Sequence, residues 1–168
     1  MDSVCTLSAT ISKRRLSVDE KLKEICLTLH RLIPEAHRVS LWSFNTGYDS
    51  IYCHLMIDEN AITSKGMQLF KNDHQAYFDA ILKHEAVVAS KARAHEATQS
   101  FNHSYFQVNQ IYSLLDYIIH YDFEPVGVIC CEAVGEPINW STEQICLLKR
   151  IANISSMFFA RELKQIIN

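Results

Sequence analysis

The sequence predicts an α+β fold, in which one antiparallel β-sheet carries the N- and C-terminal helices on one face and short helices and loops on the other. Three observations predict it. Two strand pairs, each joined by a short turn, lie between residues 37 and 133. A helix with clear apolar periodicity precedes the first pair, and another follows the second. The segment between the pairs has only short helical patterns, so we expect it to cover the second face of the sheet as a lid.

The N-terminal region is expected to form a flexible tail over residues 1–16, followed by a single domain over residues 17–168 that ends in a long C-terminal helix. The first helix begins at Ser17, because Ser17 and Glu20 have the spacing of a capping box. Pro34 ends it. Its apolar residues recur at steps of three and four: Leu22, Ile25, Cys26, Leu29, Leu32 and Ile33.

The first strand pair covers residues 37–45 and 50–58, with turn residues at 46–49. Alternation along the second strand places Tyr52, His54 and Met56 on one face. The opposite face is expected to carry the residues between them: Ile51, Cys53, Leu55 and Ile57.

The middle of the chain is predicted to be a loop, then a helix, a short strand, an irregular stretch and another short helix. The corresponding residues are 59–72, 73–84, 86–89, 90–97 and 101–108.

The second strand pair covers residues 112–121 and 126–133, and the nearly all-apolar second strand is expected to be central and buried on both faces. Residues 122–125 are expected to form a four-residue type I turn. Ser141 and Gln144 predict a second capping box. The apolar pattern of the helix that follows continues to Ile166 and Ile167, which favours a homodimer seam or an outgoing signalling helix.

Composition excludes several classes of protein. The formal net charge of −3 provides no basic field, so nucleic acid is not an expected partner. No run of 18 apolar residues exists, so no membrane insertion is expected. Six cysteines without a C-x-x-C pair predict reduced thiols, hence a cytoplasmic location.

The order of motifs resembles that of GAF domains, in particular the bacterial branch that precedes sensor kinases and diguanylate cyclases. The resemblance covers about residues 17–161 and implies a small-molecule sensor module with a possible downstream output domain. Five motifs carry it: Arg38-x-Ser40-x-Trp42, Tyr77-Phe78-x-Ala80-Ile81, Phe101-x-x-x-Tyr105, Leu114-Leu115-Asp116, and the run from Gly127 to Gly135 with Trp140-x-x-x-Glu143 after it.

Catalytic and metal motifs are absent from the sequence. His95-Glu96 lacks the second histidine of H-E-x-x-H, and no glycine-rich phosphate loop occurs. The resemblance brings in two chemistries, bilin attachment and reduction of free methionine sulfoxide. Cys53 and His54 are expected on opposite faces of a strand, and Cys130 and Cys131 lie in a predicted central strand, so neither chemistry is favoured.

The remaining hypothesis is a non-enzymatic regulatory domain that binds an unidentified small molecule between sheet and lid and relays its state through the terminal helices. The alternatives are a methionine sulfoxide reductase of the GAF type and a dimerisation scaffold without ligand. No cofactor is specified by the sequence. The candidate ligand-binding residues are Trp42, Tyr52, His54, Phe78, Tyr105 and Asp116. Asp116 stands out because a carboxylate on an apolar strand needs a partner.

Overall fold

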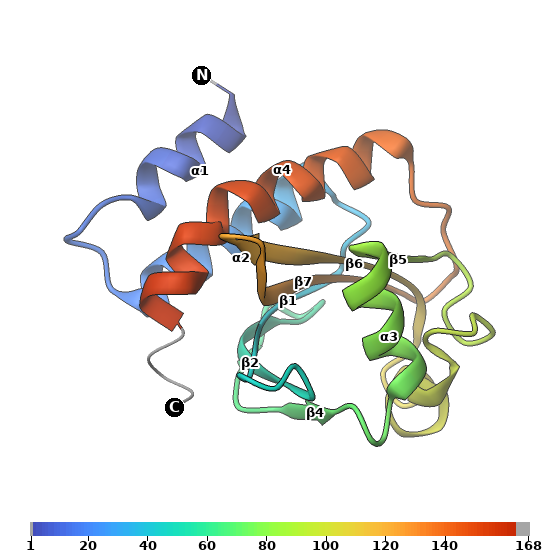
Figure 1. Ribbon diagram of the computed structural model, residues 1–168. Coiled ribbons are helices and arrows are strands. Elements are labelled where there is room, and N and C mark those ends of the chain that lie inside the picture. Colours follow the sequence, from blue (N-terminus) through green and yellow to red (C-terminus); the bar gives the residue numbers. More distant parts are fainter. Residues whose placement is uncertain (1, 164–168) are drawn as a thin grey trace.

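The computed structural model describes residues 2–163 as a seven-stranded antiparallel sheet between two layers of helices (Figure 1). The strands are β1 (Arg38–Phe44), β2 (Ser50–Ile57), β3 (Thr63–Ser64), β4 (Gln68–Phe70), β5 (Ala86–Ala89), β6 (Ile111–Tyr121) and β7 (Glu124–Val134). The helices are α1 (Ser3–Ile11), α2 (Val18–Leu32), α3 (Gln75–His84) and α4 (Thr142–Phe158), with short turns η1 (Gln99–Phe101), η2 (Asn102–Phe106) and η3 (Phe159–Leu163). This is the predicted α+β architecture.

The sheet has the order β3-β2-β1-β7-β6-β5, with β4 as a second partner of β2. All of its pairs are antiparallel. The predicted central strand is confirmed, because β7 lies between β1 and β6 and its residues from Val126 to Ala133 are buried. The two hairpins that the sequence indicates therefore meet at the middle of the sheet.

Helices α2 and α4 cover one face of the sheet, as expected for the terminal helices, and α1 packs against both of them (Figure 1). Both predicted capping boxes are present, with the Ser17 and Ser141 hydroxyls accepting from the Glu20 and Gln144 backbone N–H groups. In the part of the chain that the structure describes, no helix is long and apolar enough to cross a membrane.

The other face is covered by α3, η1 and η2, which form the lid. The predicted helix at 73–84 and the short strand at 86–89 are confirmed. The expected loop at 59–72 differs in part, because it contributes β3 and β4 to the edge of the sheet beside β2. These edge strands have two and three residues, too few to show an alternating pattern in the sequence.

The N-terminal segment differs from the expected tail, because residues 3–11 form helix α1. Its side chains Val4, Leu7 and Ile11 are buried in the core that α2 and α4 share. The Asp2 carboxylate caps the helix by accepting from the Val4 N–H. The apolar residues have helical spacing of three and four, a signal that the polar composition around them obscures.

The β1–β2 pair contains a β-bulge, which overturns the predicted faces of the second strand. Trp42 pairs with Cys53 but Leu41 pairs with Leu55, so His54 is the extra residue. His54 and Leu55 consequently lie on the helix face, and Met56 belongs to the core on the lid side. The expected alternation of Tyr52, His54 and Met56 is wrong beyond this point, because the bulge shifts the period of two.

The turn between β6 and β7 is tighter than predicted. Tyr121 pairs with Glu124, so only Asp122 and Phe123 connect the strands. Both have positive φ, +53° and +65°, as a two-residue type I′ turn requires. The four-residue type I turn expected at 122–125 is therefore wrong, since the right-handed twist of the strands favours the primed turn even without glycine.

The C-terminal helix continues past α4 into the π-helical turn η3, where Leu163 is buried. Ile166 and Ile167, on which the expected dimer seam depends, lie outside the described residues.

Phe159 packs its ring directly onto the backbone of β7 at Gly127. A Cβ at Gly127 would lie 2.5 Å from both Phe159 Cδ1 and the Trp42 carbonyl oxygen.

We expect Gly127→Ala to lower the free energy of unfolding by about 1–3 kcal/mol, because neither the β1 backbone nor the buried Phe159 ring has room for a methyl group. Urea denaturation measures the change. Gly47→Ala is the matched control, because its Cβ would meet only the Asp49 side chain at 3.5 Å; a change within about 0.5 kcal/mol is expected there. Equal stability of the two variants would contradict the close approach.

Candidate functional site

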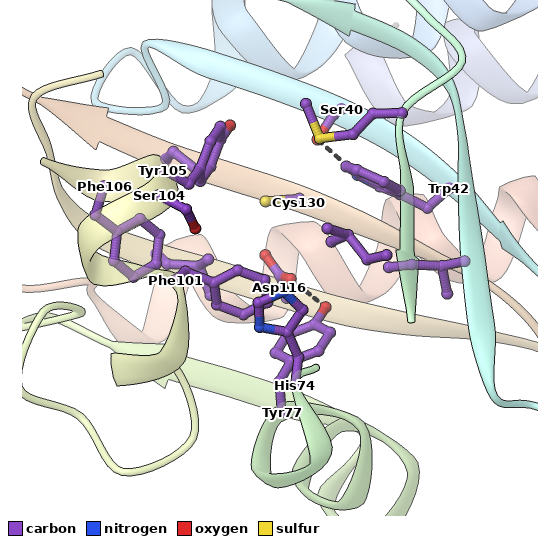
Figure 2. A pocket seen from close by; sticks show the side chains of 15 residues that line it. Ser40, Trp42, His74, Tyr77, Phe101, Ser104, Tyr105, Phe106, Asp116 and Cys130 are labelled. Atoms are coloured by element: carbon purple, nitrogen blue, oxygen red, sulfur yellow. Dashed lines mark hydrogen bonds between the residues drawn. The ribbon is translucent and has the colours of Figure 1, made fainter. Parts of the chain in front are cut away.

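A cavity of about 210 Å³ lies between the lid and the sheet (Figure 2). On the sheet side, the lining side chains come from β1, β2, β6 and β7. On the lid side, they come from α3, η1, η2 and the segment around β4. The lining residues are Ser40, Trp42, Ile51, Met67, Leu69, His74, Tyr77, Phe101, Ser104, Tyr105, Phe106, Leu114, Asp116, Cys130 and Glu132.

Three of the six candidate residues from the sequence, Trp42, Tyr105 and Asp116, line this cavity. Alternation places Trp42 and Asp116 on the lid side of β1 and β6, and η2 brings Tyr105 over them (Figure 2). Phe78 is fully buried in the same core but does not line the cavity, because it packs edge-on against Phe44 and Tyr77.

The remaining two candidates, Tyr52 and His54, lie outside the cavity. The ring of His54 hydrogen-bonds the Ser43 hydroxyl at 2.8 Å and meets the edge of Tyr52. Burial lowers the pKa of His54 to about 4, so the imidazole is neutral at physiological pH. Alternation along β2 turns Tyr52 and His54 to the face opposite Ile51, and the strand pattern does not reveal which of the two faces meets the lid.

Asp116 is the polar group that the sequence singles out, and it is 3% exposed. The Tyr77 hydroxyl donates to its Oδ2 at 2.5 Å, whereas Oδ1 has no hydrogen-bond partner (Figure 2). Burial raises the pKa of Asp116 to about 7, although the neighbouring Cys130 thiol and Tyr77 hydroxyl favour the carboxylate. The cavity thus contains a carboxyl oxygen that receives no hydrogen bond of ordinary geometry, with only the weakly donating Cys130 thiol as a further donor near the carboxyl group.

Glu132 is a second buried carboxyl group in the lining, and sequence reasoning missed it as a site residue. The Tyr105 hydroxyl donates to Glu132 Oε1 at 2.8 Å. Arg38 Nε is 3.7 Å from the same oxygen, beyond hydrogen-bond distance, and the guanidinium also pairs with Glu59. Burial therefore outweighs these partners and raises the pKa of Glu132 to about 8. The signal was available, because Glu132, like Asp116, is a charge within an apolar strand.

The lid side of the cavity is aromatic. The His74 imidazole stacks on Phe101 with 4.0 Å between centroids, and Phe101 meets Tyr77 edge-to-face. Burial lowers the pKa of His74, which favours its neutral form. Trp42 faces this wall from β1, and its indole N–H donates to Ser40 Oγ at 2.7 Å. Flat apolar surfaces with few fixed polar groups are typical of small-molecule sites.

Cys130 lines the cavity beside Asp116, whereas Cys131 points into the core under the helices. Burial raises the pKa of both thiols far above the ordinary value. All six cysteines are free. Within residues 2–163, no group of three or more His, Cys, Asp or Glu side chains has metal-binding geometry.

The raised carboxyl pKa values predict that Asp116 makes stability depend on pH. In the unfolded chain its pKa is near 3.8, so the folded state holds the proton more tightly. Its contribution to stability is complete below that value and is lost as pH rises through about 7. The free energy of unfolding of the native protein minus that of Asp116→Asn should fall by about 1 kcal/mol per pH unit between about pH 5 and pH 7.

Urea titrations at several pH values measure this difference, and subtraction removes the histidine contributions that both proteins share. The exposed Glu136→Gln is the control and should follow the native protein. A pH-independent difference for Asp116→Asn would show that the buried carboxyl group does not titrate in this range.

The overall fold agrees with comparisons to known proteins. The family model of the GAF domain matches residues 17–157. A search of curated proteins finds no match. A solved methyl-accepting chemotaxis protein fragment, residues 122 to 287, aligns with a TM-score of 0.74 at 16% identity, covering 92% of this chain and 95% of that one.

Two further structures are similar. The GAF domain of an Acinetobacter phosphoenolpyruvate-protein phosphotransferase has a TM-score of 0.72 at 13% identity, covering 95% of this chain and 91% of that one. The free methionine-R-sulfoxide reductase from Neisseria meningitidis, solved with its substrate, has a TM-score of 0.67 at 14% identity. The alignment covers 99% of this chain and 90% of that one. These identities support a shared fold, and the family model matches most of the chain. The chain belongs to the GAF domain family.

Proposed function

We propose that this protein is a non-enzymatic, cytoplasmic sensory domain that binds a small molecule in the cavity between sheet and lid. The observation that carries the proposal is Asp116, whose Oδ1 is buried at the cavity without a hydrogen-bond donor. An unsatisfied buried acceptor costs about 1–3 kcal/mol, and a ligand that donates to it would remove this cost. The aromatic lid supplies the apolar contact area that such a ligand needs.

The cavity connects to the terminal helices through the central strand. Cys130 and Glu132 face the cavity from β7, and Gly127 of the same strand lies directly under the Phe159 ring of η3. Lys21 of α2 donates to the Glu162 carboxylate of η3 at 2.9 Å. A change in the packing of β7 on ligand binding would thus be transmitted to the exit of the C-terminal helix.

A downstream output domain and a homodimer through the terminal helices belong to the same proposal. Met157 on α4 is 51% exposed, which leaves an apolar position on the outer side of this layer. Such a position suits contact with a second copy or with a following domain.

A thermal-shift screen of metabolites and nucleotides tests ligand binding. We expect at least one compound to raise the midpoint, since a ligand at 100 times its Kd stabilises the folded state by about 2.7 kcal/mol. Ser104→Trp should abolish the shift, because Ser104 lines the cavity from the lid. His103→Trp places the same ring on the exposed neighbouring residue and should keep it. If no compound stabilises the protein, the ligand-free scaffold is the better description.

The reductase alternative depends on a reactive thiol. Thiolates are the nucleophiles in disulfide chemistry, and burial raises the pKa of Cys130, the one cysteine that lines the described cavity. Cys130 also lies within β7, where paired backbone limits the movement that forming a disulfide during turnover requires. These features favour a binding function over catalysis.

We expect no turnover of free methionine sulfoxide, measured by reductant consumption in the presence of a thiol-reducing system. Cys130→Ser and the exposed Cys146→Ser should both be indistinguishable from the native protein. Activity that disappears in Cys130→Ser but persists in Cys146→Ser would overturn the non-enzymatic assignment.

A further inference from the structure

The side chains that line the cavity include two acidic residues and no lysine or arginine. The two acidic residues are Asp116 and Glu132. The Arg38 guanidinium lies 3.7 Å from Glu132 outside the lining set, and it also pairs with Glu59 and with the face of Tyr105. The cavity therefore has acceptors to offer and no cation of its own.

The hydrogen-bond inventory gives the same result. Tyr77 and Tyr105 each donate one hydrogen bond to a carboxyl group, and Asp116 Oδ1 receives none. A carboxylate has about four acceptor positions, so two buried carboxylates retain capacity for several further donors. A ligand with several N–H groups satisfies this capacity, whereas a ligand with a carboxylate or phosphate would add repulsion.

The aromatic wall favours the same kind of ligand. Rings of Trp42, Tyr77, Phe101 and Tyr105 line the cavity together with Asp116 (Figure 2). The negative faces of aromatic rings attract organic cations, most strongly where water is excluded. A cavity of about 210 Å³ holds about seven water molecules, or one aromatic ring with a short polar group.

Building on the proposed sensory function, we propose that the ligand is a small organic cation, an amine or amidine attached to a flat ring, whose N–H groups donate to Asp116 and Glu132. The ring stacks within the aromatic lid. The positive charge is held between the two carboxylates, and the unpartnered Asp116 oxygen receives its missing donor.

Proton linkage is a consequence of this arrangement. In the empty cavity burial raises the pKa of Asp116 to about 7 and of Glu132 to about 8, so both hold protons for part of the time at neutral pH. A bound cation favours the ionised forms, so its affinity should increase as pH rises from about 6 to about 9. The other titratable groups around the two acids are Tyr77 and His74 of the α3 region, Cys130 and Cys131 of β7, Cys53 of β2, Tyr105 of η2, Arg38 of β1 and Glu59, which follows β2.

Three probes with the same ring and different head groups test the proposal: benzamidine, benzamide and benzoate, as cation, neutral amide and anion. Binding is measured by thermal shift and calorimetry on the full chain. We expect benzamidine alone to raise the midpoint, with higher affinity at high pH. Asp116→Asn and Glu132→Gln should each weaken benzamidine by about tenfold or more. The exposed Glu136→Gln should leave its affinity unchanged.

The outcomes separate this inference from the function on which it rests. Benzoate or benzamide binding as tightly as benzamidine would overturn the cation assignment while leaving a ligand-binding cavity. If other compounds in the metabolite screen raise the midpoint and benzamidine does not, the cation assignment is also overturned and the ligand-binding cavity remains. Failure of the three probes and of the whole screen would remove both proposals. Because the probe comparison uses the native protein, it holds even if a variant does not fold.

Discussion

The double burial of β7 is the constraint on which the rest of this structure depends. Alternate residues of one strand face two different cores, so Cys131 packs under the helices while Cys130 and Glu132 face the cavity. Both faces must be dry, which requires helices on one side and a lid on the other. Gly127 marks the tightest point, because Phe159 occupies the space that a side chain would take.

The same burial gives the cavity its chemistry. A carboxyl group at a strand position that faces a dry core loses hydration, and its pKa rises unless enough donors replace water. Asp116 and Glu132 are both in this position, with tyrosine hydroxyls as their direct hydrogen-bond donors. Polar groups so costly to bury are tolerated where they bind something, which is why they carry the proposed function.

The sequence predicted most of the fold, and three of the six candidate ligand-binding residues, Trp42, Tyr105 and Asp116, line the cavity. Capping boxes, alternation and the apolar run of β7 are local patterns, and they correctly predicted α2, α4, the strands of the two hairpins and the helix and short strand at 73–89, although α1 was missed. Trp42 and Asp116 followed from alternation on regular strands. Tyr52 and His54 lie outside the cavity because alternation turns them away from Ile51 and Cys53, and only the packing of the whole sheet decides which face of β2 meets the lid. Glu132 was missed although, like Asp116, it is a charged residue within an apolar strand.

The sequence by itself determined the order of elements, the family resemblance and the two faces of β6 and β7, since each rests on the spacing of residues close in the chain. Only the tertiary structure decided which side chains meet. The Tyr77–Asp116 hydrogen bond joins residues 39 positions apart, and Lys21–Glu162 joins residues 141 apart. Such contacts depend on the packing of whole elements against each other, which local periodicity does not encode.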